Sequence, residues 1–169
     1  FREAAQLQTD YTRGNFGWWF FRETTQPDLY EFGTSRAAAW DCPTTVSIAD
    51  LELLHNNPRT ADVLEVIRRW EDVRSKNWLT EEQKAMLKDP GQEHILLLNG
   101  AGEYELVAYD RIQCRCEQIC AYAFTRGERH YVVCWHTTGK GILHLPFAGE
   151  GIYEEEPDGV QISFISEAG

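Results

Sequence analysis

The chain has 169 residues, of which 43% are hydrophobic and 25% charged, a composition typical of a globular protein with one domain or two small ones. Its formal net charge of −11 argues against nucleic acid as a partner and disfavours an anionic membrane surface, because both require clustered basic residues. The sequence contains no apolar run of roughly 18 residues or more, so it predicts no membrane-spanning helix.

The chain begins at Phe1 and contains one methionine, Met86, so we expect a processed product or part of a longer protein. Its five cysteines stand at irregular spacings, which does not indicate a disulfide scaffold. Reduced thiols are the simpler interpretation. A cytoplasmic location is therefore slightly favoured over secretion, where one or two disulfide bridges would be expected.

The first predicted element is the apolar run Phe16–Phe21, which suits a short strand buried on both faces of a parallel sheet. Turn residues follow it at Gln26-Pro27-Asp28. The small residues of Thr34–Trp40 indicate a second buried strand that packs closely, although alanine intrinsically favours helix. Two buried strands are therefore expected in this segment.

Three helical segments are predicted next. Ser47–Asp50 resembles a capping box that starts the first, and Pro58 separates the first from the second. Thr60 is the expected N-cap of the second helix. The apolar stripe of that helix comprises Val63, Leu64, Ile67, Trp70 and Val73. Thr80–Gln83 forms another capping box for the third helix, which Asp89-Pro90-Gly91 ends.

After Pro90-Gly91 the pattern changes to short strands separated by turns, with hairpin signals at Asn99-Gly100 and Arg126-Gly127-Glu128. The predicted strands span residues 94–98, 104–112, 121–124, 130–135, 142–145 and 160–165. Six short strands favour an antiparallel β-sandwich or an open barrel. The predicted fold class is therefore α+β, with a strand and helix segment at 1–90 and an antiparallel β domain at 91–169.

The chain resembles the C-terminal end of bacterial (β/α)8-barrel glycoside hydrolases in the segments Gly17–Glu23, Thr34–Pro43, Pro58-Arg59 and Arg69–Arg74. The resemblance implies that the two apolar runs are barrel strands seven and eight, with the helices from Ile48 packed outside strand eight. It also implies that residues 92–169 form the β-sandwich that often trails such barrels. Because a complete barrel takes about 250 residues, the remainder of the barrel or a second chain would be a partner.

This resemblance points to Glu23 and Asp41 as catalytic residues, because each follows an expected strand and such side chains point into the active site of a barrel. Glycoside cleavage requires one carboxyl group as proton donor and another as nucleophile or base. The alternative is that both are solvated loop carboxylates. Trp18, Trp19 and Trp40 are candidate substrate-binding residues, since aromatic faces stack on sugar rings, with core packing as the alternative.

Cysteine and histidine side chains of zinc-binding type occur at Cys114, Cys116, Cys120, Cys134 and His136. Their spacing departs from the paired Cys-x2-4-Cys knuckles of structural zinc sites, so we predict no metal and no cofactor. The predicted function is part of a carbohydrate-active enzyme that hydrolyses glycosidic bonds, the chain alone lacking a complete site. The alternative is a non-catalytic carbohydrate-binding or protein-interaction β module, and a metal-stabilised structural domain is the third hypothesis.

Overall fold

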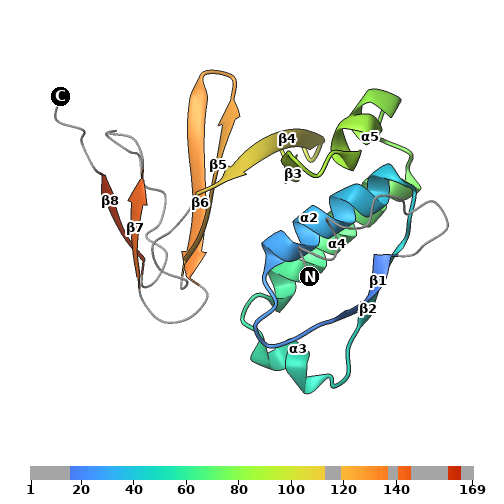
Figure 1. The fold of residues 1–169 in the computed structure, drawn as a ribbon, viewed down its shortest axis with the longest axis horizontal. Coiled ribbons are helices and arrows are strands. Elements are labelled where there is room, and N and C mark those ends of the chain that lie inside the picture. Colours follow the sequence, from blue (N-terminus) through green and yellow to red (C-terminus); the bar gives the residue numbers. More distant parts are fainter. Residues whose placement is uncertain (1–15, 113–118, 137–140, 146–159, 165–169) are drawn as a thin grey trace. The chain divides into compact units, whose positions relative to one another are not determined.

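A computed structural model describes residues 16–112, 119–136, 141–145 and 160–164, and the side chains of residues 20–112 and 119–135 (Figure 1). The chain divides into two compact units, Phe1–Ala108 and Tyr109–Gly169. Helical structure gives way to strands near Pro90-Gly91, where the sequence predicts the change. The boundary between the units nevertheless falls farther along the chain, between Ala108 and Tyr109, because strand β3 packs on helices α2 and α4 and so belongs to the first unit.

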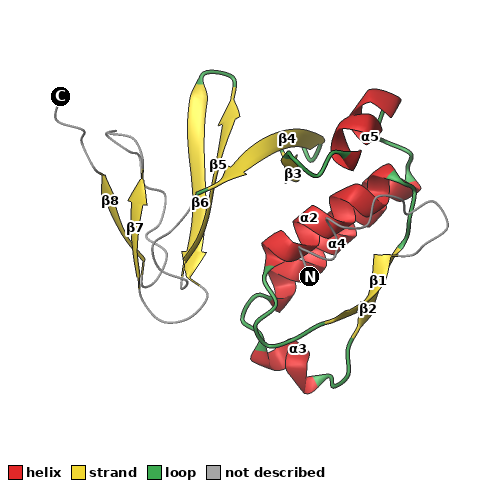
Figure 2. Ribbon diagram, viewed as in Figure 1, coloured by secondary structure: helices red, strands yellow, loops and turns green. Residues whose placement is uncertain are grey.

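The first unit contains β1 (Phe16–Phe20), α2 (Pro27–Ala39), β2 (Thr44–Ser47), α3 (Glu52–Asn56), α4 (Thr60–Ser75), α5 (Glu81–Lys88) and β3 (Glu93–Leu98). Strand β4 (Tyr104–Arg111) continues into the second unit, which contains β5 (Ile119–Arg126), β6 (Arg129–His136), β7 (Gly141–Leu145) and β8 (Val160–Phe164). The chain is thus broadly α+β, as predicted (Figure 2). Among the described residues, none of the helices combines the length and hydrophobicity needed to cross a bilayer.

The segment Thr34–Trp40 forms the C-terminal part of helix α2 and its cap, so its prediction as a buried strand is wrong. Pro27 occupies the first turn, where its missing N–H costs no hydrogen bond, and Asp28 and Arg36 complement the dipole at the two ends. The helix propensity of Ala37–Ala39 therefore outweighs the strand pattern. The segment is largely buried, but against helix α4 rather than within a sheet.

The second strand of this unit is instead β2, which the sequence analysis did not predict. Its β-branched residues Thr44, Thr45 and Val46 favour an extended backbone. Strand β2 pairs in parallel with β1, with Phe20 opposite Ser47, and α2 connects the two strands. The prediction of β1 as a strand in a parallel sheet is confirmed, and β1, α2 and β2 form a βαβ unit.

The core of the first unit centres on one face of helix α4. The predicted apolar stripe is confirmed at Val63, Trp70 and Val73, which are buried. Leu64 is exposed, and Val66 takes its place in the core, because the helical period turns Leu64 away from the buried face. Helix α2 packs along this face of α4, so the two helices form one layer beside the parallel strand pair.

The helix termini follow the predicted chemistry only in part. Thr80 and Gln83 form the predicted capping box of α5: the Gln83 N–H donates to Thr80 Oγ1 at 3.2 Å, and the Thr80 N–H donates to Gln83 Oε1 at 2.9 Å. Thr60 is the first residue of α4 rather than its cap, and its hydroxyl donates to the carbonyl oxygens of Leu54 and Asn57. The start predicted at Ser47–Asp50 falls instead on the end of β2 and the loop before α3.

The predicted hairpin of the second unit is confirmed, since β5 and β6 pair antiparallel and residues 127–128 turn between them. Strands β3 to β6 follow one another in a four-stranded sheet. Strands β7 and β8 pair in parallel, so the prediction of antiparallel pairing is wrong there. The described strands form three sheets, and a β-sandwich is not confirmed.

Candidate functional site

The parallel pairing of β1 and β2 gives this strand pair two chemically different edges. We call the segments that follow the strands, Arg22–Thr25 and Ile48–Asn57, the carboxyl edge. We call the segments around the start of β2, Asp41–Pro43 and Arg74–Lys84, the amino edge. In parallel α/β folds the loops at the carboxyl ends of strands hold the functional residues, and the opposite edge mainly stabilises the fold. The carboxyl edge is therefore the candidate functional site.

Two carboxylates leave the strands at matching positions on the carboxyl edge. Phe20 lies opposite Ser47 in the parallel register. Glu23 follows Phe20 by three residues, and Asp50 follows Ser47 by the same interval. Because adjacent strands are about 4.8 Å apart, the two acidic residues belong to neighbouring loops at one edge. Both are exposed.

The loop that carries Glu23 is a closed turn. The Thr25 N–H donates to the Arg22 carbonyl oxygen at 3.0 Å, and the Arg22 N–H donates to Thr25 Oγ1 at 2.9 Å. Thr25 is buried, whereas Glu23 and Thr24 at the centre of the turn are exposed. The turn therefore fixes the backbone on both sides of Glu23 and directs this carboxylate to solvent.

Side chains of the α3–α4 junction hold this turn from the neighbouring loop. Asn56 Nδ2 donates to Glu23 Oε1 at 3.2 Å, which leaves the second carboxylate oxygen outside that contact. Asn57 Nδ2 donates to the carbonyl oxygens of Arg22 and Thr25 at 2.9 and 2.8 Å. Asp50 Oδ1 accepts the N–H of Glu52 at 2.9 Å at the start of α3.

An aromatic ring also lies at the carboxyl edge. The last residue of β1, Phe20, is 58% exposed, whereas the next residue, Phe21, is buried in the core. Successive side chains of an extended chain alternate between the faces, so Phe20 projects away from the helix-covered face. The prediction that β1 is buried on both faces is therefore wrong at Phe20, and this edge offers an apolar surface close in sequence to Glu23.

Asp41 lies on the amino edge, so the predicted catalytic pair is not brought together. Glu23 precedes the first residue of α2 and Asp41 follows its last, so the helix of 13 residues separates them by about 20 Å. Paired carboxyl groups of glycosidases lie about 5 to 9.5 Å apart. Asp50 replaces Asp41 as the acidic residue that follows the second strand, and the β-branched run Thr44–Val46 was the signal that would have identified it.

Asp41 takes part in an ion pair with a helix terminus. Its side chain is 78% exposed, and its Oδ1 accepts from Arg74 Nη1 at 3.0 Å. Arg74 is also held by Glu71, whose Oε2 lies 2.9 Å from Nη2. Glu71 Oε1 accepts the N–H of Thr44 at 2.8 Å, so this group of charges joins the end of α4 to the start of β2.

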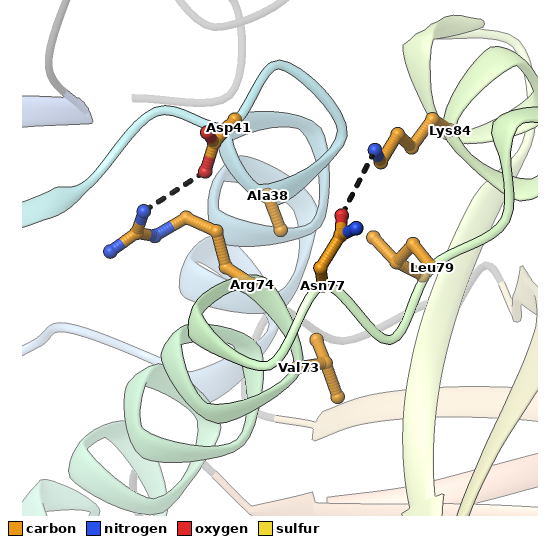
Figure 3. A pocket seen from close by; sticks show the side chains of 7 residues that line it. All are labelled: Ala38, Asp41, Val73, Arg74, Asn77, Leu79 and Lys84. Carbon is orange, nitrogen blue, oxygen red and sulfur yellow. Dashed lines mark hydrogen bonds and ion pairs between the residues drawn. The ribbon is translucent and has the colours of Figure 1, made fainter.

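A small cavity of about 40 Å³ lies on the amino edge beside this ion pair. Its lining residues are Ala38, Asp41, Val73, Arg74, Asn77, Leu79 and Lys84 (Figure 3). Lys84 Nζ donates to Asn77 Oδ1 at 3.3 Å and pairs with Glu81 at 2.8 Å, so both cations of the lining already have anionic or carbonyl partners. The cavity has room for one to a few water molecules and is too small for a sugar ring.

The three tryptophans predicted to bind substrate lie in different settings. Trp40 caps the C-terminus of α2 at the amino edge, is partly buried, and has Lys88 Nζ 4.1 Å from its ring centre. It therefore packs beside α5, away from the carboxyl edge. Trp18 and Trp19 lie within β1, but their side chains fall outside the described residues. The described aromatic residue at the carboxyl edge is Phe20, which the sequence analysis did not single out.

A buried carboxyl group lies in the core between the two edges. Glu31 Oε2 accepts the indole N–H of Trp70 at 2.6 Å. Glu31 is partly buried as a residue, and burial of its carboxyl group raises the pKa to about 8, against the opposing effects of the Trp70 hydrogen bond and the Arg69 charge. Glu31 therefore favours the protonated form near neutral pH, but it belongs to the helix-packed core rather than to the exposed edge.

The described residues contain no cluster of three or more histidine, cysteine or acidic side chains arranged to hold a metal ion. Cys114 and Cys116 lie outside the described residues, so the zinc hypothesis is untested at those positions. Cys120 and Cys134 form no disulfide bond, and burial raises the pKa of the Cys134 thiol, which disfavours its thiolate form. Both cysteines are partly buried.

No protein-family model, curated protein or solved structure matches the chain. The functional candidates are therefore the residues of the carboxyl edge, which the βαβ unit positions.

Proposed function

We propose that the chain is part of a carbohydrate-active enzyme that hydrolyses glycosidic bonds at the carboxyl edge. The observation that supports this proposal is the βαβ unit, in which Glu23 and Asp50 follow two parallel strands at the same interval. Parallel strands linked by a helix are the building unit of (β/α)8 barrels, whose active sites lie at the carboxyl ends of the strands. The second strand of the proposed barrel is thus β2 rather than Thr34–Trp40, and Asp50 takes the place of Asp41.

Glu23 and Asp50 supply the two carboxyl groups that the reaction requires. One protonates the leaving glycosidic oxygen, and the other acts as nucleophile or as the base that activates water. The Asn56 amide holds one oxygen of Glu23 and orients this side chain. Phe20, exposed at the end of β1, offers an aromatic face on which the C–H face of a pyranose ring stacks.

The proposed site requires strands beyond the β1–β2 pair. A barrel closes with eight parallel strands, and a parallel sheet is normally covered on both faces. The helices cover one face of the pair, while Phe20 is exposed on the other. We propose that further strand–helix units, from the same polypeptide or from a second chain, complete the barrel and cover this face.

The test is hydrolysis of a panel of 4-nitrophenyl glycosides by the complete polypeptide or complex that contains the chain. Wild type should release nitrophenol from at least one sugar, and Glu23→Gln should reduce kcat by about 100-fold or more. The matched control is Glu52→Gln, an exposed carboxylate on α3 that takes no part in the proposed chemistry. Lack of turnover by the wild type would contradict the proposed function, and equal rates for wild type and Glu23→Gln would remove the role of Glu23.

The second candidate function is a non-catalytic β module that binds carbohydrate or protein. It is favoured by one face of the β5–β6 hairpin, on which Val133 lies opposite Tyr122 and remains 47% exposed. Trp135 and Tyr131 flank Val133 on the same face and are only partly buried. Isothermal titration against a glycan panel distinguishes the two functions, because binding without turnover supports the module. Val133→Asp should then weaken binding.

A further inference from the structure

The turn that presents Glu23 is held by one side chain from another loop. Asn57 is 3% exposed, although asparagine is usually a surface residue. It follows helix α3 and lies 32 to 35 residues away in sequence from the two carbonyl groups that it binds. A buried polar side chain at such a position requires a full set of hydrogen bonds, and Asn57 has them.

All the polar groups of Asn57 are used. Its side-chain Nδ2 donates to the carbonyl oxygens of Arg22 and Thr25, and its Oδ1 accepts the N–H of Arg59 at 2.7 Å. Its own N–H donates to the Leu53 carbonyl oxygen, and its carbonyl oxygen accepts the N–H of Thr60. Through its side chain and its backbone together, Asn57 therefore ties the Glu23 turn to both helices of the α3–α4 junction.

The neighbouring asparagine acts on the same acidic residue in a different way. Asn57 holds the backbone before and after Glu23, whereas Asn56 donates to the Glu23 carboxylate itself. Two consecutive asparagines thus fix the position of Glu23 and the orientation of its carboxyl group. Asn56 is exposed, whereas Asn57 is buried. A substitution that removes the side-chain amide therefore leaves buried hydrogen-bonding groups without a partner only at Asn57.

From these contacts we infer that Asn57 is the positioning residue for Glu23. It clamps the turn Arg22–Thr25 so that the carboxylate keeps one place at the carboxyl edge. The catalytic part of this role rests on the proposed function, whereas the clamp itself does not. Positioning of this kind matters because displacement of a reacting group by about 1 Å can reduce a rate by about 100-fold.

The structural test uses the exposed Arg22–Glu23 bond, which is a trypsin cleavage site inside the turn. Asn57→Asp keeps the size of the side chain and the acceptor for Arg59, but places a carboxylate oxygen against two carbonyl oxygens. Native-state cleavage at Arg22–Glu23, relative to cleavage at Lys76–Asn77, should rise about tenfold or more, because losing buried hydrogen bonds favours local opening. An unchanged ratio would overturn the clamp.

Three further variants make the test specific. Asn56→Asp replaces the contact with the Glu23 carboxylate by a repulsion but keeps the backbone bonds of the turn, so it should leave the cleavage ratio near that of wild type. Thr80→Ala removes a helix cap at the other edge and lowers overall stability without acting on the turn. If Asn57→Asp does not fold, Asn57→Ser shortens the side chain and removes its two bonds to the Arg22 and Thr25 carbonyl oxygens without adding a charge. An unchanged cleavage ratio in Asn57→Ser would then overturn the clamp.

Turnover is measured on the same variants and separates positioning from stability. Asn57→Asp should lower kcat at least about tenfold with KM little changed, whereas Thr80→Ala should leave both near wild type at temperatures well below unfolding. If the cleavage ratio rises in Asn57→Asp but neither wild type nor any variant turns over substrate, the clamp stands and the proposed function is rejected. Turnover in wild type with an unchanged kcat in Asn57→Asp rejects the positioning role.

Discussion

The two edges of the β1–β2 pair differ in how they use their polar groups. At the amino edge, Arg74 is paired with Asp41 and Glu71, and the adjoining cavity is small. At the carboxyl edge, the hydrogen bonds of Asn57 go to the backbone, while the carboxylates of Glu23 and Asp50 stay exposed. One edge therefore joins elements of the fold, and the other presents acidic side chains. Similar residue types thus have different partners at the two ends of the strand pair.

The largest change in stability should come from the core that both edges share. Trp70 is almost fully buried and donates its indole N–H to Glu31. Trp70→Ala should reduce the free energy of unfolding by about 3 to 5 kcal/mol, because it removes a large buried ring and leaves a cavity. Trp70→Phe, which keeps most of the ring packing but not the donor, should cost clearly less. Urea unfolding measures both, and equal losses would mean that packing at Trp70 contributes little.

The next largest effect should depend on pH and should come from Glu31. The pKa of its carboxyl group is about 8 in the folded state, above its value in the unfolded chain. Between about pH 4.5 and pH 8 the unfolded chain therefore releases a proton that the folded state retains. The Glu31 contribution to stability is fully present below this window and is lost as the pH rises through it.

Glu31→Gln removes this titration while keeping an oxygen acceptor for Trp70. At pH 8 the variant should be more stable than wild type by on the order of a few kcal/mol, and at pH 4 the difference should shrink. Thermal unfolding of both proteins at several pH values gives the measurement. A constant difference between the two proteins from pH 4 to pH 8 would show that Glu31 titrates normally.

A smaller effect should separate the roles of Glu71 at the amino edge. Glu71→Ala removes both the acceptor for the Thr44 N–H and the partner of Arg74, and should cost about 1 to 2 kcal/mol. Glu71→Gln keeps an acceptor for Thr44 and should recover part of this loss. Chemical denaturation compares the two variants, and an equal cost would assign the whole effect to the ion pair.

The smallest effect is expected at Asp41, whose side chain makes only an exposed ion pair but whose backbone has a left-handed conformation. Asp41→Asn should change stability by less than about 0.5 kcal/mol, because the pair with Arg74 is exposed. Asp41→Ala should cost about 1 kcal/mol more, since Asp41 has a φ of 51° and alanine lacks the local hydrogen bonding that eases this left-handed conformation. Equal stabilities of the two variants would contradict this assignment.

The sequence predicted helices α4 and α5, the change to strands near Pro90 and the hairpin around Gly127, because each depends on local periodicity or turn chemistry. It failed at Thr34–Trp40, where small buried residues suit either a helix or a strand. That error moved the second strand seven to ten residues too early in the chain. Asp41 was consequently chosen in place of Asp50.

The candidate site could be predicted only in part for a related reason. Glu23 was chosen as a candidate because it follows the apolar run Phe16–Phe21. The role of Asn57 could not be read from the sequence, because its partners lie more than 30 residues away and its hydrogen bonds depend on the tertiary structure. Phe20 was not singled out because it lies in the same apolar run as two tryptophans. Its exposure depends on which face of the strand is covered by the helices.

One pair of identical substitutions tests the functional difference between the edges most directly. Asp50→Asn and Asp41→Asn are the same chemical change at an exposed aspartate, one at the carboxyl edge and one at the amino edge. In the aryl-glycoside assay, Asp50→Asn should lower kcat by about 100-fold or more, while Asp41→Asn should retain the wild-type rate. Equal rates for the two variants, or a greater loss in Asp41→Asn, would contradict the assignment of the active site to the carboxyl edge.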